Sequence, residues 1–210
     1  MELLGKLFGS EARVKIMRLF LFNPKRAYAV ADIAERAKVP SSVVRKECTV
    51  LRNAKLIEPK SFVRAIEQKR GKKTVVKKKR ESGFTLNENF PYLEQMQNLL
   101  IYTVLVKNDS VVRRLRDTCK LKLVVVSGVF IKDWDSRVDL LVVGDKIKAK
   151  PLENVIKTLE AEIGKELRYS AFETEDFQYR YGMYDKLIRD VLDYPHTTIY
   201  NKLGLVEEKR

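Results

Sequence analysis

Cysteine and histidine are scarce in this chain, and long apolar runs are absent. The 210 residues include two cysteines, Cys48 and Cys119, and one histidine, His196. Two cysteines are too few for a disulfide framework or a cysteine-based metal site, and an isolated histidine is typical of a turn or packing residue. No run of 18 apolar residues exists, and the N-terminus lacks the apolar core of a signal peptide. We therefore expect a reduced, cytoplasmic protein with no membrane partner.

Positive charge is abundant, and it is concentrated in the N-terminal part of the chain. The protein contains 42 Lys and Arg residues and 28 Asp and Glu residues, which gives a formal net charge of +14. Residues 1–90 hold 22 basic and 9 acidic residues, whereas residues 91–210 hold 20 and 19. This asymmetry predicts one domain that contacts a polyanion and a second domain with a different role.

The stretch from Tyr28 to Ala54 predicts two short helices joined by a tight turn at residues 38–40. In the second helix Val44, Cys48 and Leu51 share one face at helical spacing and are expected to be buried. Either of the two serines after the turn could cap that helix. The opposite face is short, polar and basic, and it is formed by Ser41, Ser42, Val43, Arg45, Lys46 and Thr49. Such a face suits a helix that lies in the major groove of DNA.

Residues 56–86 predict a strongly basic β-hairpin directly after these helices. Residues 62–66 alternate as in a strand, residues 69–73 form a glycine-containing turn, and residues 74–80 return. Eight basic residues fall between positions 69 and 80 of this hairpin: Lys69, Arg70, Lys72, Lys73, Lys77, Lys78, Lys79 and Arg80. This density suits contacts with phosphates or insertion into a minor groove. A solvated charge run and a localisation-type basic cluster are the alternatives.

The segment IAERAKVPSSVVRKECTVLRNAKLI, together with the basic hairpin, resembles the winged helix-turn-helix of bacterial and archaeal transcription regulators. The resemblance covers residues 1–90 and implies double-stranded DNA as the partner. Such domains usually carry glycine at the positions of Lys38 and Lys55. A left-handed backbone at either lysine would cost about 1 kcal/mol. The alternative is an ordinary helical hairpin with a solvated basic face.

Helical segments are also expected on both sides of this region. Residues 7–22 predict a scaffold helix that Ser10 caps, whose basic side chains are expected to be solvated. Residues 91–119 predict two linker helices. The apolar face of the first linker helix could pack between domains or against a second copy in a homodimer. That face is formed by Leu93, Met96, Leu100 and Val104.

Residues 120–210 predict alternating strands and helices, which gives the whole chain an α+β fold. Strands are expected at 123–126, 137–143, 167–172 and 197–200, and helices at 151–166, from 174, and at 184–192. The segments VVVSGVF, SRVDLLVVGD and FETEDFQYRYGMYDKLIRDVL resemble the minimal nucleotidyltransferase domain of the DNA polymerase beta superfamily, in the form fused behind a helix-turn-helix. The resemblance implies a C-terminal α/β domain.

The resemblance also implies a two-metal site, of which this chain carries only a degenerate remnant. Family enzymes use a Gly-Ser pair, an Asp-x-Asp pair on the second strand and a third acidic residue. Here the first pair is reversed as Ser127-Gly128, Arg137 replaces the first aspartate, and Asp139 alone remains. Residues 168–170 supply no acid.

We expect Arg137 to share a strand face with Asp139 and to pair with it, which leaves no metal site. Asp133 and Asp135 in the preceding loop are the substitutes that the sequence offers. With neither catalytic residues nor a cofactor expected, the second domain would serve in sensing or dimerisation. A nucleotide or another small anion stays open as an effector.

The sequence therefore predicts a DNA-binding transcriptional regulator with an inactive nucleotidyltransferase-like domain. One alternative is an active nucleotidyltransferase that acts on a nucleic-acid or protein acceptor. Another is a non-specific architectural or RNA-binding protein, in which the basic domain recognises shape and charge only.

Overall fold

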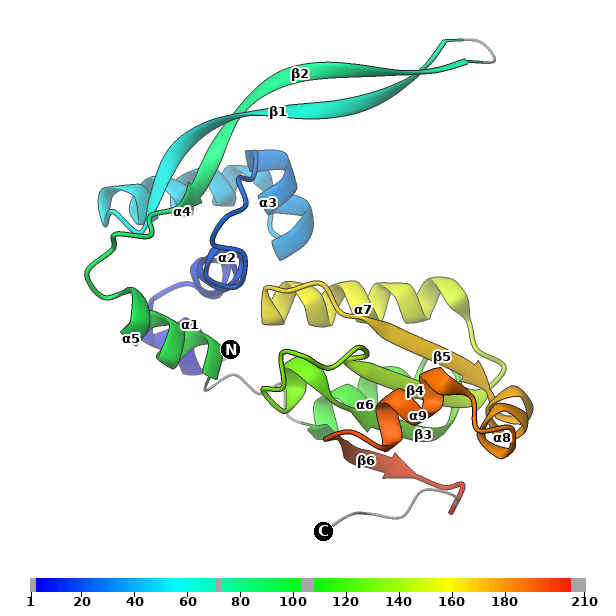
Figure 1. Ribbon diagram of the computed structural model, residues 1–210. Coiled ribbons are helices and arrows are strands. Elements are labelled where there is room, and N and C mark those ends of the chain that lie inside the picture. Colours follow the sequence, from blue (N-terminus) through cyan, green and yellow to red (C-terminus); the bar gives the residue numbers. More distant parts are fainter. Residues whose placement is uncertain (1–2, 71–72, 103–107, 205–210) are drawn as a thin grey trace. The chain divides into compact units, whose positions relative to one another are not determined.

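The computed structural model describes residues 3–70, 73–102 and 108–204, and the side chains of all these except 66–70, 73–77 and 102. The chain forms two compact units. The first comprises Met1–Thr103 and Ala161–Lys165, and the second Val104–Glu160 and Glu166–Arg210. The fold is α+β, as predicted, and the segment expected as a linker is divided between the units (Figure 1).

Four helices form the body of the first unit, and they are α1 (Leu3–Leu7), α2 (Glu11–Phe22), α3 (Val30–Ala37) and α4 (Ser41–Asn53). Ser10 caps α2, as predicted, because its side chain accepts a hydrogen bond from the Arg13 N–H at 3.1 Å. The expected helix from residue 7 is interrupted at Gly9, whose φ of +74° is left-handed. The apolar faces of α2, α3 and α4 meet in one core.

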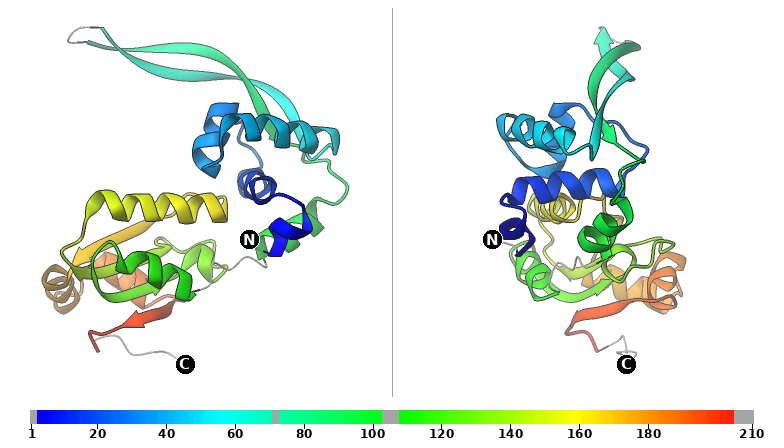
Figure 2. Two further views of the ribbon diagram at one scale, coloured as in Figure 1. Left: turned by 180° about the vertical axis from the view of Figure 1, so that it is seen from behind. Right: turned by 90° about the vertical axis from the view of Figure 1, so that its left-hand side faces the viewer.

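The strands β1 (Ile57–Arg70) and β2 (Lys73–Leu86) form an antiparallel hairpin with a continuous register from Ile57↔Leu86 to Arg70↔Lys73. At about 3.4 Å per residue, each 14-residue strand is roughly 45 Å long. Figures 1 and 2 show that the hairpin is twisted and projects from the helices of its unit. Tyr28 pairs with Phe84 in an isolated bridge at its base.

The first unit is completed by α5 (Leu93–Gln97) and the π-helical turn η1 (Asn98–Tyr102). Leu93 and Met96 pack against the core, and Leu100 is fully buried in it. The described part of the apolar face that we considered for a homodimer therefore packs, at least in part, against the core of its own unit. Val104, its last member, lies outside the described residues.

The second unit contains a four-stranded sheet with the order β5-β4-β3-β6. Its elements are α6 (Asn108–Arg116), β3 (Lys120–Val126), the 3-10 turn η2 (Gly128–Phe130), β4 (Leu140–Asp145), α7 (Ala149–Ile163), β5 (Tyr169–Glu173), α8 (Thr174–Gly182), α9 (Lys186–Leu192) and β6 (Thr197–Asn201). β3 is antiparallel to both β4 and β6, whereas β4 and β5 are parallel and are connected through α7. Each strand overlaps an expected region, but β4 begins at Leu140 and not at residue 137.

Both faces of this sheet are covered, which explains why β3 and β4 are almost continuously apolar. Leu123 and Val125 pack with Phe177 of α8 and with Ile188 and Val191 of α9. α6 contacts β3 and β6. The neighbouring strand residues, which alternate to the other face, are buried as well.

Candidate nucleic-acid interface

Helix α4 exposes the face that the sequence predicts for DNA contact. Val44, Cys48 and Leu51 are buried. On the other side Ser41, Ser42, Arg45, Lys46 and Thr49 are exposed, and Val43 is half-buried. Burial and the neighbouring Glu47 charge raise the pKa of the Cys48 thiol to about 12, so this cysteine is a core residue.

The start of α4 differs from the expectation in one detail. Pro40 occupies the N-cap position, and no side-chain hydrogen bond caps the helix. Ser41 and Ser42 are instead its first two residues. They lie at the end where the backbone N–H groups of a helix have no intrahelical partner. Their hydroxyl groups and these N–H groups are therefore presented together on the exposed end of α4.

The lysines at the two expected glycine positions both have a left-handed backbone. Lys38 has φ 51° and ψ 50°, and Lys55 has φ 62°. The turn after α3 is closed by a hydrogen bond from the Val39 N–H to the Ala34 carbonyl at 3.0 Å. The end of α4 is closed by the Leu56 N–H, which donates to the Leu51 carbonyl at 3.0 Å. The left-handed residues therefore set the directions in which the chain enters α4 and β1.

Two arginines of α2 were expected to be solvated, but both side chains have partners within the protein. The Arg13 Nε donates to the Glu47 Oε2 at 2.7 Å, and its Nη1 donates to the Phe8 carbonyl at 2.8 Å. This ion pair fixes α4 to α2. Arg18 is 2% exposed and its Nε donates to the Leu100 carbonyl at 3.2 Å. Periodicity alone missed both arginines, because a long basic side chain can pack its stem in a core while its head finds acceptors.

The hairpin is attached to α3 by a charged cluster that sequence analysis also missed. The Arg64 guanidinium donates to the Asp32 carboxylate, and its Nε lies 3.2 Å from the Glu81 Oε2. Asp32 also accepts from the Ala29 N–H at 2.9 Å. Burial tends to raise the pKa of Asp32, but the hydrogen bonds from Arg64 and Ala29 and the positive charges of Arg64 and Arg36 lower it overall.

The β1–β2 register determines which hairpin cations are available to a ligand. Arg64 faces Lys79, whose Nζ lies 3.6 Å from the Glu81 Oε1. Lys78 and Arg80 lie on the opposite face, because side chains alternate along a strand. Lys78 and Arg80 are exposed, and neither forms an ion pair with any residue whose side chain the structure describes.

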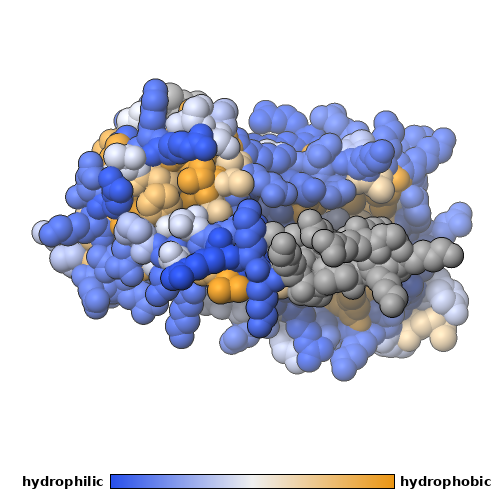
Figure 3. Space-filling view, turned by 90° about the horizontal axis from the view of Figure 1, so that it is seen from above, coloured by the Kyte–Doolittle hydropathy of each residue, from blue (hydrophilic) through white to orange (hydrophobic). Residues whose placement is uncertain are grey.

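The other predicted hairpin cations cannot be placed in the same way. Lys72 lies outside the described residues, and so do the side chains of Lys69, Arg70, Lys73 and Lys77. Their backbones, except that of Lys72, belong to the paired strands. Hydrophilic residues dominate the surface that is visible from above in Figure 3, with small hydrophobic areas between them.

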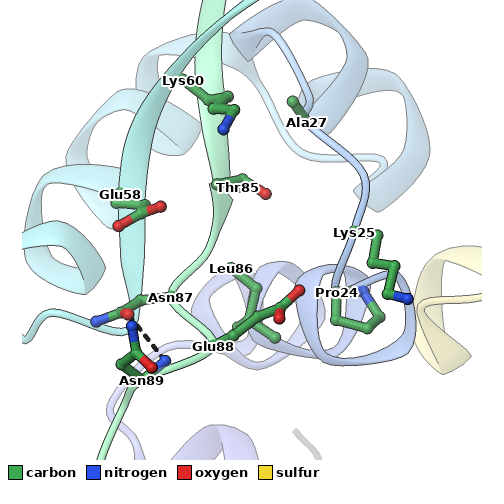
Figure 4. Close-up of a pocket in the computed structure, with 10 residues that line it drawn as sticks. All are labelled: Pro24, Lys25, Ala27, Glu58, Lys60, Thr85, Leu86, Asn87, Glu88 and Asn89. Atoms are coloured by element: carbon green, nitrogen blue, oxygen red, sulfur yellow. Dashed lines mark hydrogen bonds between the residues drawn. The ribbon is translucent and has the colours of Figure 1, made fainter.

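A depression of about 400 Å³ lies between the hairpin base and the segment that follows α2 (Figure 4). It is lined by Pro24, Lys25, Ala27, Glu58, Lys60, Thr85, Leu86, Asn87, Glu88 and Asn89. Two lysines and two glutamates surround it, so positive and negative groups balance. This mixed charge differs from the positive charge that a phosphate chain requires, and we therefore place the depression outside the candidate interface.

In the second unit, the remnant of the expected nucleotidyltransferase site has a structural arrangement. Asp139 is fully buried. Its Oδ1 accepts from the Val129 N–H at 3.0 Å, and its Oδ2 accepts from the Arg168 N–H at 2.9 Å and the Arg168 Nε at 3.2 Å. Gly128 has φ +55°, and a Cβ added there would lie 2.1 Å from the Asp139 Oδ1. The carboxylate is therefore enclosed by N–H donors.

The expected pairing of Arg137 with Asp139 is wrong. Arg137 and Asp139 both precede β4, so the strand alternation that would put their side chains on one face does not apply to them. Its Nη1 instead lies 2.8 Å from the Asp190 Oδ2. The Ser127 hydroxyl donates to the Val138 carbonyl. The arginine that meets Asp139 is Arg168, which the sequence offered only as a non-acidic strand residue.

The remaining candidate ligands do not converge either. Asp133 lies in the loop before β4, where its Oδ1 accepts from the Asp135 N–H at 3.2 Å. The His196 Nδ1 lies 2.8 Å from the Tyr194 carbonyl. Within residues 3–70, 73–102 and 108–204, no group of three or more His, Cys, Asp or Glu residues is arranged to hold a metal ion.

Comparisons of the chain with family models, curated proteins and solved structures gave no match. The helices that the structure describes include none with the length and apolar character needed to cross a membrane.

Proposed function

We propose that the protein is a DNA-binding transcriptional regulator with a winged helix-turn-helix in its first unit. Helix α4 would enter the major groove of double-stranded DNA, and the hairpin would contact the neighbouring backbone or minor groove. The observation that carries the proposal is that one unit has two exposed basic surfaces. These are the outer face of α4 and the β2 face with Lys78 and Arg80.

The ion pairs that hold these surfaces to the helical body support the proposal. The ion pair between Arg13 and Glu47 fixes α4 to α2. The cluster of Arg64, Asp32 and Glu81 fixes the hairpin to α3. A preorganised surface loses less conformational entropy when it binds, so more of its contact energy appears as affinity.

The two surfaces are expected to contribute differently to binding. Residues near the N-terminus of a recognition helix reach base edges, which assigns sequence recognition to Ser42, Arg45 and Lys46. Thr49 lies one turn further along, where its hydroxyl donates to the Arg45 carbonyl at 2.9 Å. Hairpin lysines contact phosphates, which carry no sequence information. Specificity should therefore depend on α4, and salt dependence mainly on the hairpin.

The test compares Arg45→Ala with Arg52→Ala on a duplex selected from a random library and on an unselected duplex. Both arginines are exposed on α4, but Arg52 lies two turns nearer its C-terminus. Arg45→Ala should cost about 1–3 kcal/mol on the selected site and little on random DNA. Arg52→Ala should weaken both equally or leave both unchanged.

A selection that recovers no motif would favour the second candidate function, a non-specific architectural protein. The observation that favours it is the long hairpin, whose exposed cations Lys78 and Arg80 are suited to backbone contact. An equal loss on both duplexes with Arg45→Ala would point in the same direction. Binding that is unchanged when Lys78 and Arg80 are replaced by Ala would contradict a role for the hairpin in either function.

For the second unit, we propose a nucleotidyltransferase-like domain that does not transfer nucleotides and serves in sensing or dimerisation. The enclosure of Asp139 supports this, because Mg²⁺ requires carboxylate oxygens that are free to coordinate it. Incubation with labelled nucleoside triphosphates, Mg²⁺ or Mn²⁺, and nucleic-acid or protein acceptors should give no labelled product. Label transfer that a folded Asp139→Asn variant lacks would establish the enzyme alternative instead.

A further inference from the structure

A second cluster of basic side chains lies in the second unit, around the edge strand β6. The register pairs Tyr200 with Val124 of β3, and a hydrogen bond from the Lys202 N–H to the Lys122 carbonyl at 2.7 Å continues this pairing. Lys202 directly follows β6 (Thr197–Asn201), and its side chain lies beside that of Tyr200. α6 contacts both β3 and β6.

The ring of Tyr200 brings two positive charges together. The Cζ of Arg116, at the end of α6, lies 5.3 Å from the ring centroid, and the Nζ of Lys202 lies 5.9 Å from it. Both distances are in the range of a cation–π interaction. Arg113 is exposed one turn earlier on α6 and extends the cluster.

These cations lack counterions in the described part of the chain. Arg113, Arg116 and Lys202 are exposed, and none of them forms an ion pair with a described residue. The carboxylate at the nearby end of β4, Asp145, lies instead 3.6 Å from the Lys122 Nζ and accepts a hydrogen bond from the Thr174 hydroxyl. Like charges held together without a counterion repel one another, and a bound polyanion would relieve this repulsion.

We propose that Arg113, Arg116 and Lys202, arranged around Tyr200, form a second nucleic-acid contact site that binds the phosphodiester backbone. The cations lie on an open surface, which suits a repeating anion rather than one enclosed phosphate. The aromatic ring between them is a feature of surfaces that bind nucleic-acid strands, where bases stack on aromatic side chains. An acidic peptide would match the charge alone.

The test measures binding of the full-length protein to fluorescent single-stranded and double-stranded DNA over a series of salt concentrations. The variant is Arg116→Ala/Lys202→Ala. Its matched control is Lys132→Ala/Lys186→Ala, which removes two exposed lysines of the same unit that neighbour Asp133 and Asp185. The wild type, the variant and the control are each also prepared with the added substitutions Lys78→Ala/Arg80→Ala. The loss of the hairpin contacts is then measured separately from the loss of this site.

The magnitude of the slope of log K against log[salt] should fall by about 1.8 for duplex DNA, or about 1.4 for single strands, when two phosphate contacts are lost. The strand type with the larger effect identifies the ligand. A slope equal to that of the control variant on both DNAs would overturn the proposal. So would displacement of DNA by polyglutamate at the same concentration of charge, because an acidic protein would then be the better partner.

A folding defect in the double variant would be seen as a lower melting temperature. In that case Arg113→Ala replaces it, since the Arg113 side chain is exposed and forms no ion pair with a described residue. A decrease of about 0.9 in the duplex slope with Arg113→Ala supports the site, and no decrease refutes it. Either result is independent of whether α4 and the hairpin bind DNA.

Discussion

Replacing Lys38 with glycine should stabilise the first unit. Lys38 has φ 51° and ψ 50°, a conformation in which the Cβ of an L-residue is close to the following carbonyl oxygen. This strain costs roughly 1–2 kcal/mol and is absent in glycine. Glycine also makes the unfolded chain more flexible, which lowers the free energy of unfolding by about 0.4–1 kcal/mol. The net gain expected for Lys38→Gly is therefore about 0.5–1 kcal/mol.

The control for this substitution is Lys38→Ala, which retains the Cβ and its strain but removes the amine and its contacts. We expect Lys38→Ala to lie within about 0.5 kcal/mol of the wild type, as is usual for surface changes. Urea unfolding measures the free energies, and the corresponding melting midpoint of Lys38→Gly should rise by roughly 2–8 °C for a unit of this size. Lys55→Gly, at φ 62°, should behave in the same way.

The reasoning would be refuted if Lys38→Gly were no more stable than Lys38→Ala. That result would mean that the turn relaxes the strain by a route other than the removal of the Cβ. If both variants were destabilised equally, the contacts of the lysine amine would be the dominant contribution. If the left-handed backbone alone determined the stability, Lys38→Gly would be more stable than Lys38→Ala.

Two further predictions concern the attachment of the hairpin. Gly83→Ala should destabilise the first unit by about 1–3 kcal/mol in urea unfolding, because its Cβ would lie 2.1 Å from the Tyr28 carbonyl oxygen; unchanged stability would contradict this close approach. The pKa of Asp32 is lower in the folded unit than in the unfolded chain, where it is about 4. Ionised Asp32 should therefore stabilise the unit above a pH of about 4, and this contribution should be lost as the pH falls through the folded pKa. Asp32→Asn should remove that part of the pH dependence, and an identical pH profile for the variant would show that another group titrates.

Local pattern predicted much of the fold, because the relevant signals lie within a few residues of each other. The buried stripe of Val44, Cys48 and Leu51 follows from helical spacing, and the Ser10 cap follows from its position before a helix. The length of the hairpin was less evident. The expected strands covered residues 62–66 and 74–80, whereas the paired strands run from Ile57 to Arg70 and from Lys73 to Leu86.

Contacts between residues far apart in the chain were not predictable in this way. Arg64, Asp32 and Glu81 meet only because the hairpin register puts Glu81 next to Arg64 and the tertiary fold brings α3 to both. The same holds for the burial of Arg18, whose acceptor at Leu100 is 82 positions away. Charge counts in a sequence therefore overestimate the cations that are available to a ligand.

The Asp139 site shows how the start of a strand changes a chemical inference. With Arg137 in the strand, alternation would have placed its charge beside Asp139. The chain instead enters β4 after Asp139, and Arg137 pairs with Asp190. A fully buried carboxylate then needs other donors, since burial without them is costly, and the N–H groups of Val129 and Arg168 supply them. Through these hydrogen bonds the carboxylate holds the η2 turn and the start of β5 together, and Gly128 provides the space for its Oδ1. The acid at position 139 is therefore required for structure.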